Sequence, residues 1–280
     1  MLETMRSIVK FRRRVLFSIA AAFATLFLTS PAVSAQGTVM TWTVDGEKRA
    51  ALVFSPAPTT SAIKHPVVFV FHGHGGNMQG FSQKAHLQTI WKEAIIVYPQ
   101  GLKGRPMPAD PQGLRPGWEF EANQTDGYVG NKDLDFYDAM LATMKQKFSV
   151  DDQRVYLTGF SNGAIFSYLL WAERGKVIAA IAACAGVLWE SEHLTQPRAL
   201  LAVGGKADTT LPFDKQQQTI ELARTADNAT GQGQSCGQDC TFYASTSQTP
   251  VKTFIHSGGH VYPPWLPAET VKFFKAHKHP

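Results

Sequence analysis

Arg154–Arg174, RVYLTGFSNGAIFSYLLWAER, indicates more about the fold than any other part of the chain. A short apolar run ends at Gly159. Ser161 and Gly163 follow at alternate positions, and an apolar stretch at helical spacing comes next. Gly-x-Ser-x-Gly between a strand and a helix is typical of a nucleophile elbow, a tight turn that exposes the serine Oγ. Glycine suits both flanking positions because it has no Cβ to crowd the neighbouring strand or helix. The alternative is a serine in an ordinary Gly-rich turn.

Apolar runs elsewhere predict the sheet around this elbow. Val67–Phe71 and Ile95–Tyr98 are continuously apolar, as expected of strands buried on both faces of a parallel sheet. Further strands are expected at 38–44, 49–55, 177–184, 199–203 and 251–256, and helices at 81–91, 133–148, from 219 onward and at 268–277. The recurring strand–helix units predict an α/β-hydrolase-type α/β fold, with a mostly parallel central sheet and helices on both faces.

The first 35 residues have the pattern of a secretory signal peptide. Five basic residues precede the apolar core Val15–Leu28, and small residues lead to a cleavage site after Ala35. The core is short for a membrane span, and an uncleaved anchor is the alternative. We therefore expect 1–35 to be removed, 36–280 to form a single catalytic domain without membrane attachment, and the protein to be secreted to the periplasm or the medium.

Most of the excess positive charge lies in this leader. The whole chain has 27 Lys and Arg against 22 Asp and Glu, and without the leader's five basic residues and Glu3 the counts are 22 and 21. A net charge of +1 gives no reason to expect nucleic-acid binding.

A serine nucleophile needs a base, and the base needs an orienting acid. The acid and then the histidine should follow the serine along the chain. Asp208 comes just after the predicted strand 199–203, and His260 comes just after the strand 251–256, in the turn Ser-Gly-Gly-His. Both therefore lie at strand ends, where catalytic groups gather in open α/β sheets. Asp214 and His256 are the competing candidates.

Two further features complete the predicted site. The turn His72-Gly73-His74-Gly75 directly follows a central strand, so we expect backbone N–H groups of His74 and Gly75, with that of Asn162, to form the oxyanion hole. The side chain of Asn162 should then be dispensable. The long Pro- and Gly-rich stretch 103–131 is expected to cover the cleft, with Trp118 as a candidate wall for the substrate.

Of the three cysteines, Cys236 and Cys240 are close enough in sequence to form a small-loop disulfide in an oxidising compartment. Zinc binding is the alternative, but it needs more ligands than this pair. We expect neither a metal nor an organic cofactor.

These residues give the chain a resemblance to the secreted esterases of the polyhydroxybutyrate depolymerase and feruloyl esterase family, over roughly residues 48–275. The resemblance is carried by His72-Gly73, Tyr98-Pro99, the segment 154–163, Gly205-Lys206-Ala207-Asp208 with Pro212, and Gly258-Gly259-His260 with Pro263. It implies that Ser161, Asp208 and His260 are nucleophile, acid and base. The chain departs from the family at Gly204, Tyr262 and Ala164, where histidine, tryptophan and glycine are frequent.

The prediction is a secreted serine esterase that forms an acyl-enzyme, acting on a small or oligomeric ester. Feruloyl esters, acetylated sugars and 3-hydroxybutyrate oligomers all stay open as substrates, as does the oligomeric state. An acyltransferase would use the same triad with another acceptor, and a non-catalytic secreted binding protein would have a broken triad position.

Overall fold

The computed structural model describes residues 37–56, 63–104, 107, 109–122, 131–189 and 193–280. These residues belong to one compact unit, Pro31–Pro280. The predicted signal peptide, 1–35, lies outside them. Within the described ranges, no helix has the length and apolar character needed to cross a membrane.

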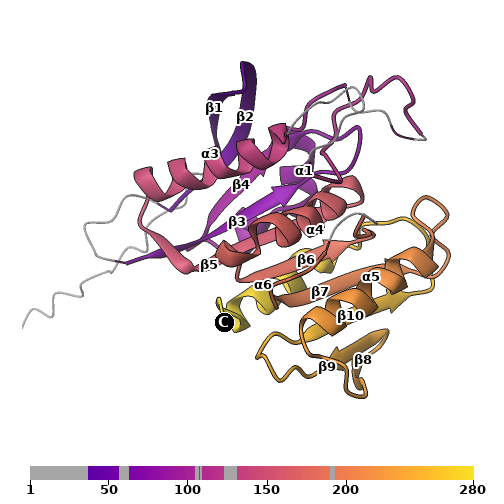
Figure 1. The fold of residues 1–280 in the computed structure, drawn as a ribbon. Helices are drawn as coiled ribbons and strands as arrows, with labels where there is room; N and C mark the ends of the chain where they lie inside the picture. Colours follow the sequence, from indigo (N-terminus) through magenta and orange to yellow (C-terminus); the bar gives the residue numbers. More distant parts are fainter. Residues whose placement is uncertain (1–36, 57–62, 105–106, 108, 123–130, 190–192) are drawn as a thin grey trace, which may run out of the picture. The chain divides into compact units, whose positions relative to one another are not determined.

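A ten-stranded sheet forms the centre of the fold, with the strand order β1-β2-β4-β3-β5-β6-β7-β10-β9-β8 (Figure 1). Strands β4, β3, β5, β6, β7 and β10 are parallel, while β1–β2 and β9–β8 add antiparallel strands at the two edges. The strand bounds are β1 Thr38–Val44, β2 Glu47–Phe54, β3 His65–Phe71, β4 Ile95–Pro99, β5 Val150–Phe160, β6 Ala180–Cys184, β7 Ala199–Gly205, β8 Gln234–Gly237, β9 Cys240–Tyr243 and β10 Val251–His256.

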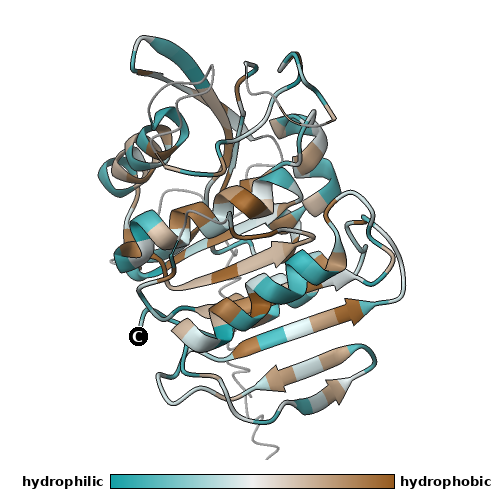
Figure 2. Ribbon diagram, turned by 45° about the vertical axis from the view of Figure 1, so that its right-hand side comes forward, coloured by the Kyte–Doolittle hydropathy of each residue, from teal (hydrophilic) through white to brown (hydrophobic). Residues whose placement is uncertain are grey.

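Helices cover both faces of this sheet. Their bounds are α1 Met78–Ala85, α2 Leu87–Ile90, α3 Lys132–Lys147, α4 Asn162–Arg174, α5 Phe213–Ala226 and α6 Leu266–Ala276. The apolar side chains of α3, α4 and α5 belong to one core cluster, and those of α1, α2 and α6 belong to another. Figure 2 shows brown apolar positions on the sides of α4 and α5 that face the strands.

Strand β3 shows why the sequence builds two cores. Val67, Phe69 and Phe71 enter the cluster of α3, α4 and α5, whereas Val68 and Val70 enter the opposite cluster. Successive strand residues point to opposite faces, so a strand covered on both faces must be apolar at every position. The predicted fold class is confirmed.

Three local features differ from the prediction by more than a shift of a few residues at a strand or helix end. The helix expected at 81–91 is divided into α1 and α2 by His86, whose φ of 35° is left-handed and ends α1. Helix α5 begins at Phe213 rather than Thr219, directly after Pro212. The polar stretch after α5 contains the β8–β9 hairpin, and a disulfide joins its two strands at Cys236 and Cys240.

Candidate active site

The turn between β5 and α4 has the backbone of a nucleophile elbow. Ser161 has φ 56° and ψ −123°, a conformation that side-chain-bearing residues rarely adopt. A Cβ on Gly159 would lie 2.2 Å from the oxygen of Gly163, and one on Gly163 would lie 2.3 Å from the oxygen of Phe71. Both positions therefore require glycine, because the elbow is packed against its own helix and against β3.

Asp208 and His260 are in direct contact. His260 Nδ1 lies 2.8 Å from Asp208 Oδ2, and Asp208 is 5% exposed. Burial opposes the carboxylate, yet hydrogen bonds from His260 and from the N–H groups of Leu211 and Thr210 hold the pKa of Asp208 below its ordinary value. Because a carboxylate accepts, Nδ1 carries the proton, and Nε2 of the neutral ring is left as a hydrogen-bond acceptor.

The competing candidates have other positions and partners. Asp214 lies in the first turn of α5 and is exposed. His256 belongs to β10, where its Nδ1 accepts the N–H of Gly258. Neither contacts Asp208 or His260 through a hydrogen bond in the described structure.

The parallel strands bring the histidine to the serine's edge of the sheet. The Phe160 ring, next to Ser161, lies 5.0 Å from the His260 ring, and the Ser161 N–H donates to Cys184 O at 2.9 Å. Cys184 Sγ in turn donates to Val261 O at 3.5 Å. Ser161 Oγ and His260 Nε2 form no hydrogen bond in the structure, and catalytic bonds of this kind often tighten only in the Michaelis complex.

The turn after β3 borders Ser161. A Cβ on Gly73 would lie 3.4 Å from Ser161 Cβ, so this backbone is in contact range of the serine. The prediction that Gly75 donates to the oxyanion is wrong, because its N–H donates to Pro116 O at 2.7 Å. The N–H of Asn162, at the start of α4, and that of His74 stay as the predicted pair.

His72 holds this turn as a neutral side chain. Its Nε2 accepts the Gly101 N–H at 3.1 Å and its Nδ1 donates to Gly73 O at 2.8 Å. Burial lowers the pKa of His72 to about 4. His74 is fixed differently, since its Nε2 lies 3.0 Å from Asp110 Oδ2.

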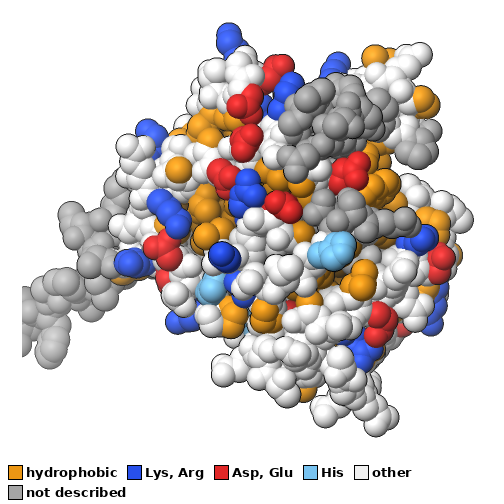
Figure 3. All heavy atoms as spheres, in the orientation of Figure 1, with side chains coloured by type: hydrophobic (Ala, Val, Ile, Leu, Met, Phe, Trp, Pro, Cys, Tyr) orange, Lys and Arg blue, Asp and Glu red, His pale blue; other side chains and the backbone are white. Residues whose placement is uncertain are grey.

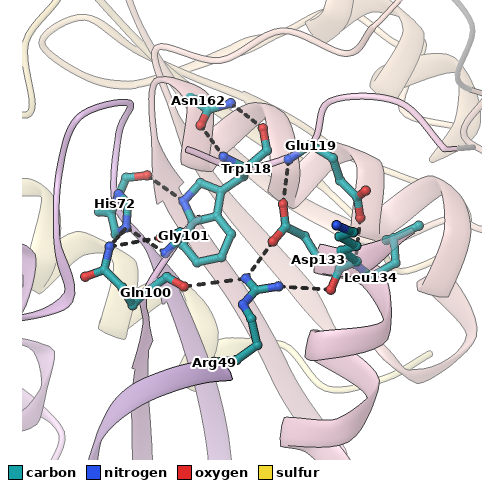
Figure 4. A network of polar contacts seen from close by, with 10 residues as sticks. Arg49, His72, Gln100, Gly101, Trp118, Glu119, Asp133, Leu134 and Asn162 are labelled. Carbon is teal, nitrogen blue, oxygen red and sulfur yellow. Dashed lines mark hydrogen bonds and ion pairs between the residues drawn. The ribbon is translucent and has the colours of Figure 1, made fainter. Parts of the chain in front are cut away.

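Trp118 does not line a cleft, so that prediction is wrong. The side chain is fully buried, its Nε1 donates to His72 O at 2.9 Å, and its ring stacks on Phe166 at 5.4 Å. Asn162 is also fully buried: Oδ1 accepts the Trp118 N–H at 2.7 Å and Nδ2 donates to Trp118 O at 3.0 Å (Figure 4). The Asn162 side chain is therefore a structural link between the elbow helix and the long loop, contrary to our expectation.

An ion pair continues this network away from the elbow. Arg49 on β2 contacts Asp133 at the start of α3 at 2.6 Å, with both side chains fully buried (Figure 4). Asp133 Oδ2 accepts the Glu119 N–H at 2.8 Å, and Glu119 Oε1 accepts the Leu134 N–H at 2.7 Å. No local motif in the sequence predicts this group, because Arg49 and Asp133 are 84 residues apart.

The structure also contains an apolar pocket that the sequence analysis did not predict. Its volume is about 560 Å³, and it lies between the segment after β6 and one side of α5. Its wall residues Val187 and Leu211 pack with Ile165, one helical turn after Ser161. The only sequence signal was the apolar run that continues past the end of β6. The lining residues are Val187, Leu188, Trp189, Leu211, Pro212, Lys215, Gln218, Thr219 and Leu222.

Comparisons with known proteins agree with this architecture. Residues 58–256 match the model of a family described as phospholipase/carboxylesterase. A probable feruloyl esterase C of Aspergillus oryzae is 28% identical over 227 residues, which cover 76% of this chain and 78% of that protein. The bifunctional acetylxylan esterase/xylanase XynS20E of Neocallimastix patriciarum is 25% identical over 162 residues, covering 57% of this chain but only 22% of that protein. Among solved structures, an acetyl xylan esterase from Aspergillus awamori has a TM-score of 0.64 at 14% identity, covering 85% of this chain and 99% of that one, a likeness of fold.

Proposed function

The chain belongs to the phospholipase/carboxylesterase family, and we propose that it is a secreted serine esterase in which Ser161, His260 and Asp208 are nucleophile, base and acid. The observation that carries the assignment is the 2.8 Å contact between His260 and Asp208, at the same sheet edge as a serine held at positive φ. Feruloyl and acetylxylan esterases among the relatives support carboxylic esters as the substrate class.

The chemistry follows from the hydrogen-bond roles of the three side chains. Ser161 Oγ attacks the ester carbonyl carbon while His260 Nε2 takes its proton, and Asp208 stabilises the imidazolium. The N–H groups of Asn162 and His74 bind the oxyanion. The C–O bond to the alcohol then breaks and the alcohol leaves with the proton from His260. Water, deprotonated by the same nitrogen, releases the acid and restores Ser161.

The apolar pocket beside α5 is the proposed site for one apolar group of the ester. At about 560 Å³ it has the size of a small-molecule site, and Trp189, 39% exposed, offers an aromatic surface. We therefore propose feruloyl esters as the preferred substrates, because an aromatic acyl group matches an apolar wall that contains a tryptophan. Acetylated sugars and 3-hydroxybutyrate oligomers make less use of it. Figure 3 shows orange hydrophobic atoms at the surface of the molecule among charged ones.

Export is part of the proposal. The basic, apolar and small-residue segments of 1–35 are those of a cleaved leader, so residues 36–280 should be the active form in the periplasm or the medium.

The test is hydrolysis of a panel of esters by residues 36–280 and by Ser161→Ala. The panel contains p-nitrophenyl acetate and butyrate, methyl ferulate and a 3-hydroxybutyrate dimer. Loss of the nucleophile should lower kcat by several orders of magnitude, on the order of 10⁶ in a well-studied triad. Ordinary turnover by Ser161→Ala would refute the triad.

A second variant tests the pocket. Leu222 lines it and is half exposed, so Leu222→Trp should fill the pocket without disturbing the core. We expect kcat/KM for methyl ferulate to fall on the order of tenfold, the effect of losing the contacts of about one methylene in a hydrophobic pocket. The value of kcat/KM for p-nitrophenyl acetate should not change. If Leu222→Trp changes kcat/KM by the same factor for both substrates, the apolar group of the ester binds elsewhere.

A further inference from the structure

Gln216, on α5, is in contact with the proposed catalytic acid. The side chain is 2% exposed, and its Nε2 donates to Asp208 Oδ2 at 2.9 Å and to Leu211 O at 2.6 Å. Asp208 Oδ2 is the same oxygen that His260 contacts. Nothing in the local sequence distinguishes Gln216 from Gln217 and Gln218, so its position could not be predicted.

The chemistry of its partners fixes the orientation of the Gln216 amide. A carboxylate and a carbonyl oxygen only accept hydrogen bonds, so both must face the NH₂ group. The amide oxygen Oε1 then points toward β7, where it is buried and has no hydrogen-bond partner among the residues that the structure describes. A Cβ on Gly204 would lie 2.8 Å from this oxygen, so the glycine leaves the space that the amide occupies.

We propose that Gln216 is a positioning residue of the triad, which holds the Asp208 carboxylate toward His260 and shares its negative charge. The proposal rests on the proposed function of Ser161, Asp208 and His260. It adds a fourth side chain, supplied by the helix that also lines the apolar pocket.

The hydrogen-bond inventory of Asp208 shows what Gln216 contributes. Oδ1 accepts the N–H groups of Thr210 and Leu211, whereas Oδ2 accepts only His260 and Gln216 among the described residues. Without Gln216, the charge on Oδ2 would be balanced by the imidazole alone. An unshared negative charge on Oδ2 attracts a positive charge on its neighbour more strongly, so the acid limb of the activity profile should move to higher pH.

Other titratable groups lie near this contact and are unchanged by a substitution at Gln216. Lys84 on α1 lies 5.1 Å above the Phe160 ring, and the Cys184 thiol at the end of β6 interacts with Asp208. His256 is the last residue of β10 and is half-buried, and Asp214 and Lys215 directly precede Gln216 on the exposed side of α5. A difference between variants therefore reports on the Gln216–Asp208 contact.

The experiment compares kcat and KM for p-nitrophenyl acetate, from about pH 5 to pH 9, in the full-length protein and three variants. Gln216→Met keeps the volume but has no donor. Gln216→Glu donates only while its carboxyl group is protonated. Gln217→Met is the matched control, since Gln217 is an exposed neighbour on the same helix.

We expect Gln216→Met to lower kcat on the order of tenfold and to move the acid limb of kcat/KM upward by about half a unit to one unit, with KM nearly unchanged. The activity of Gln216→Glu relative to Gln216→Met should be highest at low pH and fall as pH rises, because the introduced carboxylate then repels Asp208. Gln217→Met should follow the parent protein at every pH.

Each result decides for or against the positioning role. An unchanged kcat and acid limb in Gln216→Met, with Ser161→Ala inactive, overturns the role of Gln216 and leaves the triad standing. An active Ser161→Ala refutes the proposed function itself. If Gln216→Met does not fold, Gly204→Ala takes its place, since its Cβ displaces the Gln216 amide. The same upward shift is then expected, and its absence overturns the proposal.

Discussion

Replacing the elbow serine by glycine should stabilise the protein while it abolishes catalysis. Ser161 is held at φ 56° and ψ −123°, and a residue with a Cβ in such a region costs about 1–3 kcal/mol. Ser161→Ala is the matched control, because it loses the same hydroxyl but keeps the Cβ. Glycine removes the strain, although its freer unfolded chain costs about 0.5–1 kcal/mol.

The strain relief less the glycine cost lies between about 0 and 2.5 kcal/mol, so the free energy of unfolding of Ser161→Gly should exceed that of Ser161→Ala by about 1 kcal/mol. In a domain of this size that difference raises Tm by roughly 2–4 °C. Urea and thermal unfolding of the two inactive proteins measure it directly. If Ser161→Gly is no more stable than Ser161→Ala, the strain does not reside in the Cβ of the elbow residue, and the reasoning fails.

Three further changes have outcomes that the structure fixes. Asn162→Ala leaves the N–H and C=O of buried Trp118 without their partner, so the free energy of unfolding in urea should fall by about 2–4 kcal/mol; an unchanged midpoint would contradict this. The pKa of His72 is about 4 when folded and near 6.5 when unfolded, so the unfolded chain binds the extra proton and stability should fall by about 3 kcal/mol between pH 6.5 and 4. This loss should be absent in His72→Gln, compared by urea titration at each pH. Gly163→Ala places a Cβ 2.3 Å from a main-chain oxygen of β3 and should destabilise by more than about 4 kcal/mol, whereas Gly231→Ala, with nothing within 4 Å, should be tolerated; thermal scans of soluble protein distinguish them.

The features that the sequence predicted well are those written in consecutive residues. The elbow around Ser161 carries its own glycines, and buried parallel strands are apolar at every position, so both were visible locally. The contact between Asp208 and His260 was predictable because each lies within four residues of a strand's end, and the ends of parallel strands meet at one edge.

The features that were missed depend on partners far along the chain. Trp118 was expected in a cleft because its loop is rich in Pro and Gly, but the loop folds inward and its indole N–H finds His72 O. Gly75 was expected to donate to substrate, but Pro116 approaches it. The contact of Gln216 with Asp208 depends on how α5 packs against β7, which no local pattern encodes.

The strand order has a consequence for how the protein reaches its native state. Strands β3 and β5 are neighbours although β4 lies between them in sequence, and His260 must return to a serine that was synthesised 99 residues earlier. Contacts between residues so far apart in sequence form late in folding. Closing the long loop between them costs entropy before the contact contributes any stabilisation. During refolding, helical circular dichroism should thus recover before esterase turnover. Regained activity would report the final step, in which β10 completes the parallel sheet and carries the histidine to its place.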